Sequence, residues 1–156
     1  MEISFTYNSQ RGFSSNQFAI WIEDCQGNLV TTLYTTKFTA AGGWSKRPNS
    51  LPLWVQKSGL SALAKKEIDA FTGATPKTGA QCYRWDGKDK NGNLAAPGEY
   101  RVFLEATLRD QNRVLYSASF TPVSGRHAEA EVKAEYFGSG TAERGMIEKV
   151  KVLFFQ

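Results

Sequence analysis

A seven-residue segment near the middle of the chain combines two hydroxyl groups, a carboxylate and three very small residues. In Asp69-Ala70-Phe71-Thr72-Gly73-Ala74-Thr75, the side chains of Asp69 and Thr72 can hydrogen-bond within a turn. Gly73 and Ala74 leave room for a phosphate group to approach the backbone, and Thr75 supplies a hydroxyl to which that group can be joined. An ordinary Thr/Gly turn is the alternative, and the residues alone leave both interpretations open.

This segment resembles the acceptor motif D-x-x-[S/T]-G-A-[S/T], to which FMN is attached covalently. The motif occurs in FMN-binding subunits of sodium-pumping and electron-bifurcating respiratory complexes, where a periplasmic flavin transferase uses FAD and forms a phosphoester with the final Thr or Ser. The resemblance implies FMN on Thr75, and the other cofactor-binding residues would be Asp69, Thr72, Gly73 and Ala74. The chain departs from the motif at Pro76, which predicts an extended Thr75 followed by a strand instead of a helix.

The other reactive residues give no support for catalysis or for a metal site. His127 is the only histidine, it lies in no H-E-x-x-H or G-x-S-x-G pattern, and strand alternation places it facing solvent. Cys25 and Cys82 belong to no C-x-x-C pair, so zinc and thioredoxin chemistry are not expected. The two cysteines can form one disulfide or remain thiols, depending on the compartment. We expect no catalytic residue and no metal ligand, which favours an electron-transfer or binding protein over an enzyme.

Length and composition predict one globular domain over residues 1–156. The chain has 156 residues, of which 41% are hydrophobic and 22% are charged. Its net charge of +4 is spread along the sequence, so no nucleic-acid partner is expected. No apolar stretch reaches the roughly 18 residues that a membrane-spanning helix needs. The first seven residues resemble no signal peptide, which indicates either a cytosolic protein or a mature form whose signal has been removed.

Alternation of apolar and polar residues dominates most of the chain. It predicts strands over residues 3–7, 18–22, 30–34, 102–108, 114–120, 128–136 and 150–154. Turn signals at residues 26–28 and 110–112 predict two hairpins. Each strand has one apolar face, which we expect to cover one side of a shared core. The pattern therefore predicts an all-β protein: an Ig-like antiparallel β-sandwich of about 7–9 strands.

Residues 44–80 interrupt this alternation and predict a helical and loop insertion. We expect a helix over 51–57 between Ser50 as N-cap and Gly59 as C-cap, helical turns over 61–68, and a loop over 69–79. Long ordered insertions in compact domains are usually functional, so a site is expected here first.

Two further resemblances concern the whole chain. Trp85-Asp86-Gly87 and the following residues to Tyr100 resemble the Ig-like module of flagellar hook-capping proteins, which implies a sandwich and no activity. A wider set of segments resembles the domain-of-unknown-function family 2271: residues 16–24, 42–44, 47–48, 51–52, 54, 69–76 and 85–87. These predicted periplasmic proteins have no established activity and are associated with flavin transferases and with membrane proteins of the iron-reduction and PepSY type. The resemblance implies a removed signal peptide, a redox neighbourhood, and a possible disulfide between Cys25 and Cys82.

Two hypotheses follow. In the first, the protein is an extracytoplasmic electron carrier with FMN on Thr75 and a pocket shaped by the insertion, and its partners are a flavin transferase and a membrane redox protein. The candidate ring-stacking residues are Trp44, Trp54 and Trp85, and the candidate phosphate-neutralising residues are Lys77 and Arg84. In the second, it is a non-enzymatic Ig-like binding or assembly module of the cell envelope, whose insertion contacts a partner through exposed tryptophans.

Overall fold

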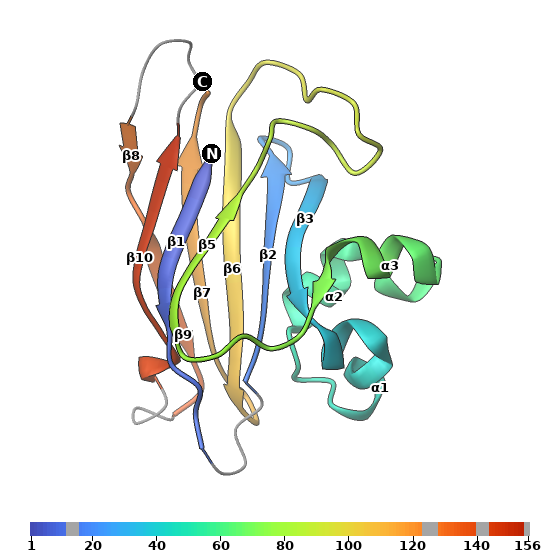
Figure 1. The fold of residues 1–156 in the computed structure, drawn as a ribbon, viewed down its shortest axis with the longest axis vertical. Helices are drawn as coiled ribbons and strands as arrows, with labels where there is room; N and C mark the ends of the chain where they lie inside the picture. Colours follow the sequence, from blue (N-terminus) through green and yellow to red (C-terminus); the bar gives the residue numbers. More distant parts are fainter. Residues whose placement is uncertain (12–15, 123–127, 140–143, 155–156) are drawn as a thin grey trace.

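The computed structural model describes residues 1–11, 16–122, 128–139 and 144–154, which form two packed β-sheets and a helical insertion (Figure 1). The four-stranded sheet has the order β5 (Gly79–Arg84), β1 (Glu2–Tyr7), β10 (Ile147–Phe154), β8 (Ala128–Ala130). The six-stranded sheet has the order β4 (Thr72–Gly73), β3 (Leu29–Thr36), β2 (Gln17–Asp24), β6 (Tyr100–Arg109), β7 (Asn112–Phe120), β9 (Lys133–Phe137). Neighbouring strands are antiparallel except β3 and β4, which are parallel. The predicted all-β sandwich is confirmed.

The sandwich core lies between the two sheets and follows the predicted alternation. Ile3, Phe5 and Tyr7 alternate with half-buried polar residues along β1 and are almost fully buried. They face Phe18 and its neighbours on β2, with the Phe5 and Phe18 rings edge to face at a centroid distance of 5.6 Å. A period of two residues is what a strand with one buried face requires, so these elements could be read directly from the sequence.

The outer face of the six-stranded sheet is also buried, which the sequence analysis did not predict. Ala19 and Trp21 on β2 are fully buried and pack against Leu51 and Trp54 of the insertion. Figure 1 shows the helices gathered beside β3, away from the four-stranded sheet. The prediction of one apolar face per strand is therefore wrong for β2, because the helical insertion forms a second, outer core on that sheet.

The insertion consists of short helical segments. They are a π-helical turn (Thr39–Gly43), α1 (Trp44–Lys46), α2 (Pro52–Ser58), a 3₁₀ turn (Leu60–Ala62) and α3 (Lys65–Phe71). Gly59 ends α2 in the left-handed conformation, with φ of +60°, as predicted. Ser50 is not the N-cap; it is buried, and its hydroxyl lies 2.7 Å from that of Thr39. The loop predicted over 69–79 is also wrong at its start, because Asp69 belongs to α3 and residues 72–73 form β4.

Two strand predictions needed correction. The strand predicted over residues 128–136 is two strands, because β8 pairs with β10 in one sheet and β9 pairs with β7 in the other. In β3, the pairing with β2 skips Val30 and Leu33, so two bulges break the expected alternation. Thr32 therefore lies opposite Trp21 on the outer-core side, whereas Tyr34 lies opposite Ile20 on the sandwich-core side. His127, expected to face solvent, lies outside the described residues.

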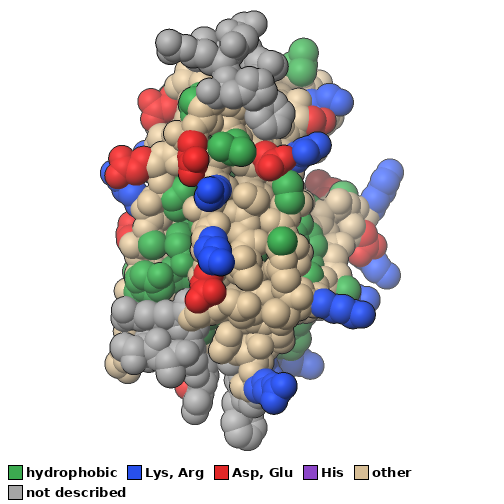
Figure 2. Space-filling view, turned by 60° about the vertical axis from the view of Figure 1, so that its left-hand side comes forward, with side chains coloured by type: hydrophobic (Ala, Val, Ile, Leu, Met, Phe, Trp, Pro, Cys, Tyr) green, Lys and Arg blue, Asp and Glu red, His purple; other side chains and the backbone are tan. Residues whose placement is uncertain are grey.

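The surface features match the sequence expectations in part. Cys25, in the turn after β2, and Cys82, on β5, are exposed free thiols, so the possible disulfide is not formed. None of the described helices is long and apolar enough to cross a membrane. Figure 2 shows basic and acidic side chains interspersed on the face that carries the four-stranded sheet.

Candidate functional site

The residues of the acceptor-like motif lie where the chain leaves the insertion. Asp69 is exposed in the last turn of α3. Thr72 ends this helix, and its hydroxyl donates a hydrogen bond of 2.6 Å to the carbonyl of Ile68. Thr72 and Gly73 then form β4, which pairs with the last two residues of β3. Thr75 is exposed on the segment 74–78, which crosses from β4 to β5 and so from one sheet to the other (Figure 1).

An aromatic cluster lies next to β4 at this end of the sandwich core. The ring of Tyr34 lies 4.8 Å from that of Tyr83 and 5.2 Å from that of Phe18. Phe5 stacks on Tyr83 at 6.0 Å. Burial raises the pKa of both Tyr34 and Tyr83, because the phenolate form is poorly solvated there, so both hydroxyls stay protonated at neutral pH.

A groove of about 600 Å³ follows the outer edge of β3. β4 pairs with this edge only at Thr35 and Thr36, and the backbone N–H of Lys90 donates to the Val30 carbonyl near the other end. Between these contacts, the groove is bounded by β3, by α3, and by the loop that follows β5. Ala70 and Phe71 of the acceptor-like motif belong to its wall.

The groove has apolar walls and a charged rim. Leu33, Leu63 and Phe71 provide apolar surface, and Phe71 also packs edge to face on Trp54 at 5.9 Å. Three lysines line it, from α3 and from the loop after β5: Lys66, Lys88 and Lys90. The backbone N–H groups of Asn93 and Asn91 donate hydrogen bonds to the Asp89 carboxylate and lower its pKa, so Asp89 is ionised. The same hydrogen bonds hold the loop in a turn. Three carboxylates, those of Glu67, Asp86 and Asp89, line the groove as well, and Asp86 pairs with Lys88 at 3.4 Å. This combination of an apolar wall and a rim of mixed charge suits an aromatic ligand with polar edges.

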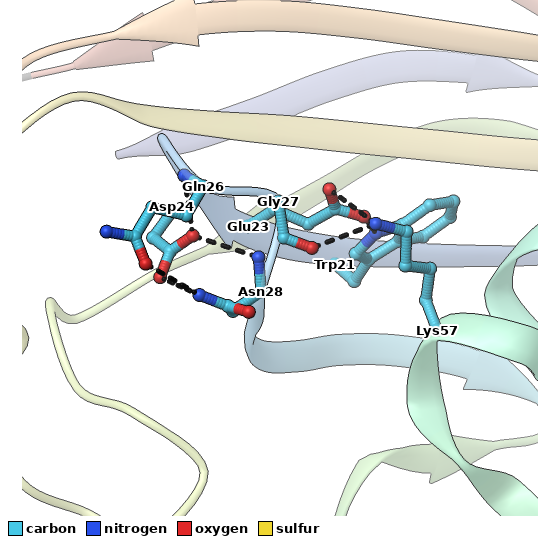
Figure 3. Close-up of polar contacts among 7 residues, drawn as sticks. All are labelled: Trp21, Glu23, Asp24, Gln26, Gly27, Asn28 and Lys57. Carbon is cyan, nitrogen blue, oxygen red and sulfur yellow. Dashed lines mark hydrogen bonds and ion pairs between the residues drawn. The ribbon is translucent and has the colours of Figure 1, made fainter.

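An ion pair between half-buried Lys57 and buried Glu23 fixes the C-terminal end of α2 beside the groove (Figure 3). Lys57 lies 3.2 Å from the carboxylate of Glu23 and donates to the Gly27 carbonyl at 2.8 Å. The other Glu23 oxygen accepts a 2.8 Å hydrogen bond from the Trp21 indole N–H. In the same view, Asp24 accepts two backbone hydrogen bonds within the β2–β3 turn. The helix end and the turn are thereby tied together.

A second buried carboxylate holds the N-terminal end of α2. Glu105 on β6 is fully buried and accepts hydrogen bonds from the backbone N–H groups of Leu53 and Trp54, at 3.2 and 2.8 Å. It also pairs with Arg113 at 2.8 Å. Free N–H groups and the helix dipole make a helix N-terminus favourable for an anion. Glu105, on β6, thus caps α2 in place of Ser50, the residue predicted for that role. The local sequence around α2 could not reveal a cap that comes from a distant strand.

The protonation of Glu105 predicts a pH dependence of stability. Burial raises its pKa above the ordinary value of 4.5, although its hydrogen bonds and Arg113 act in the opposite direction. A raised pKa in the folded state means that this contribution to stability is complete below about pH 4.5 and is lost as the pH rises through the folded-state pKa. We expect the difference in unfolding free energy between wild type and Glu105→Ala to shrink from pH 4.5 to pH 7. Urea unfolding at several pH values measures this; a difference that grows with pH would contradict it.

The residues proposed to contact a flavin do not all lie at the groove. Trp54 is fully buried in the outer core, so its ring is not accessible to a ligand; Trp44 is half-buried there and does not line the groove. Trp85 lines the groove, but only 6% of its surface is exposed. Arg84 is paired with Glu2 at 2.8 Å, whereas Lys77 is exposed two residues after Thr75.

Sequence reasoning missed the groove itself. Its lysines come from segments more than twenty positions apart, and only the topology brings Lys66 next to Lys88 and Lys90. The alternating lysines of Lys88-Asp89-Lys90 were the available signal, and the sequence analysis assigned no site to them. The resemblance of this loop to the hook-capping module and the single domain over 1–156 stay predictions.

Comparison with known proteins identifies the family of the chain. The comparisons with curated proteins and with solved structures find no match. The family described as "Predicted periplasmic protein (DUF2271)" matches residues 1–138, a region that includes β1 to β9, the insertion and the acceptor-like motif. The wider resemblance seen in the sequence is thereby confirmed, and the chain belongs to this family of predicted periplasmic proteins.

Proposed function

We propose that this periplasmic protein is an electron carrier with FMN attached covalently to Thr75. The observation that carries the proposal is the position of the motif Asp69–Thr75. One part of it, Ala70 and Phe71, forms the wall of the groove, and its last residue, Thr75, presents an exposed hydroxyl two residues after β4, the strand that pairs with β3. A single short segment therefore combines an attachment point with a binding surface.

The dimensions of the groove fit a tethered flavin. Thr75 follows Phe71 by four residues, so their Cα atoms lie at most about 14 Å apart. The groove volume of about 600 Å³ is within the range of cofactor pockets. Phe71, Leu63 and Leu33 offer apolar contact to a ring system, and the rim offers both lysines and carboxylates to its polar edge.

Flavins carry out one- and two-electron transfer, and this chemistry belongs to the cofactor. The protein would supply position, charge and shielding from water. Phe71 and Leu63 would exclude water from one side of the ring, and Lys66 and Lys90 would supply positive charge at its rim, opposed by Glu67 and Asp89. Lys77, exposed next to the acceptor, would neutralise the phosphate.

The attachment reaction balances with FAD as the donor. The hydroxyl oxygen of Thr75 forms a bond to the phosphorus of the FMN half, and the bond from that phosphorus to the bridging pyrophosphate oxygen breaks. AMP leaves, the hydroxyl proton passes to a base of the transferase, and no atom changes oxidation state. The required partners are thus a periplasmic flavin transferase for attachment and a membrane redox protein for electron exchange.

The mass of the intact protein tests the proposal. After periplasmic co-expression with a flavin transferase, we expect a gain equal to one FMN less one water, located by peptide mapping on the fragment that contains Thr75. The same transferase is assayed in parallel on an acceptor it is known to modify. An unmodified mass together with an active transferase would refute the proposal.

The alternative function, an Ig-like binding or assembly module, depends on an exposed aromatic anchor in the insertion. Trp54 is fully buried, which removes one of the two candidates, and Trp44 is only half-buried. No contact of the described residues favours this alternative over the carrier.

A further inference from the structure

The segment that displays Thr75 is anchored on both sides. On one side, the hydroxyl of Tyr34 donates a 2.6 Å hydrogen bond to the carbonyl of Ala74. On the other, the backbone N–H of Ser9 donates a 2.9 Å hydrogen bond to the hydroxyl of Thr78. Only residues 75–77 lie between these two contacts, and Pro76 among them has a fixed φ angle.

We propose that Tyr34 is a positioning residue, which holds Thr75 in the orientation that a flavin transferase modifies. This inference rests on the proposed function, since it assigns a role in the same attachment reaction. Tyr34 directly precedes the two residues of β3 that pair with β4. The backbone that carries its side chain therefore lies next to the backbone that leads into the acceptor segment.

The ring of Tyr34 fits against Gly73 only because that residue has no side chain. A Cβ atom on Gly73 would lie 2.4 Å from Cε2 of Tyr34, far inside van der Waals contact. The packing of Tyr34 therefore requires glycine at position 73, independently of any need for a phosphate to approach the backbone. Because Gly73 has no side chain, the Tyr34 ring can lie against it and its hydroxyl can reach the carbonyl of the next residue, Ala74.

Tyr34 is itself held in place by residues of two other strands. Its ring packs on Phe18 of β2 and on Tyr83 of β5, with centroid distances of 5.2 and 4.8 Å. Tyr83 is on the strand into which the acceptor segment leads. The hydrogen bond to Ala74 is therefore made from a fixed ring, which is a requirement for a residue that positions another group.

Removal of this hydroxyl should slow attachment without unfolding the protein. For Tyr34→Phe we expect the limiting single-turnover rate of FMN transfer, at saturating FAD and transferase, to fall roughly fivefold, the effect of one lost hydrogen bond. Tyr100→Phe is the matched control, because the hydroxyl of Tyr100 also donates to a loop carbonyl, that of Ala96. The melting temperatures of both variants are measured alongside. A wild-type rate for Tyr34→Phe, or an equal loss in both variants, would overturn the inference.

A second measurement does not depend on the transferase. Lys77 is exposed within the anchored segment, and cleavage by trypsin after Lys77 requires that segment to change conformation. We expect this cleavage, followed by mass spectrometry, to be severalfold faster in Tyr34→Phe than in wild type or Tyr100→Phe. Unchanged cleavage would overturn the positioning role even if Thr75 carries FMN. Faster cleavage of Tyr34→Phe, together with a wild type that takes up no flavin, would support the anchor and would refute the proposed function alone.

Discussion

Thr75→Ala is expected to abolish covalent flavin completely while leaving the fold unchanged. The side chain of Thr75 is exposed, so its removal creates no cavity and breaks no core contact. Its hydroxyl is the only atom that the proposed phosphoester uses on the protein. In-gel flavin fluorescence and intact mass after co-expression with the transferase should both show a protein without FMN. Thr75→Ser, which keeps a hydroxyl at the same place, should remain modified.

Thr121→Ala provides the matched control. Thr121 is also an exposed threonine followed directly by a proline, but it lies outside the motif. This variant should carry the same amount of flavin as wild type. Flavin retained in Thr75→Ala would show that another residue is the acceptor, and loss in both variants would point to a general effect on expression or folding.

Glu105→Ala should cause the largest loss of stability among single substitutions considered for this protein. The substitution leaves Arg113 without its buried partner and two backbone N–H groups at the start of α2 without an acceptor. Breaking one side of a buried ion pair costs about 3–5 kcal/mol, a large share of the roughly 5–15 kcal/mol that stabilises an ordinary domain. The melting temperature should fall by roughly 10 °C. Differential scanning calorimetry and urea unfolding measure the two quantities.

Glu99→Ala is the control for the loss of a negative charge. Glu99 is exposed in the loop before β6, so its removal should change the unfolding free energy by less than about 0.5 kcal/mol. A similarly small effect for Glu105→Ala would mean that water enters and solvates Arg113 and the helix end. The anchoring role of Glu105 would then be wrong.

The sandwich could be predicted because its strands show their burial in the sequence. Ile3, Phe5 and Tyr7 alternate with polar residues, and turn residues separate the paired strands, so both hairpins were found at nearly their observed positions. The insertion was also located, because residues 44–80 lack the alternation of the flanking strands. Local pattern was sufficient for the strands that alternate in this way.

Most of the errors concern interactions between distant segments. Alternation over residues 128–136 shows two faces but does not show that the chain changes sheets between β8 and β9. The bulges at Val30 and Leu33 appear only when β3 is paired with β2. The cap of α2 comes from Glu105, more than fifty positions away. For the site, the sequence predicted the acceptor-like segment, which stays a prediction, whereas the groove and the contact with Tyr34 required the tertiary structure.

The contact between Tyr34 and Gly73 also bears on whether the acceptor motif can be transplanted. As a seven-residue sequence, Asp69–Thr75 looks like a tag that could be grafted onto any exposed loop to install a flavin. In this protein, however, the segment takes its shape from a tyrosine on a neighbouring strand, and the bulge at Leu33 turns that tyrosine towards it. A graft would therefore need to include β3 with its bulge. The smallest unit that could be transferred is the strand pair β3–β4, and not the seven-residue peptide alone.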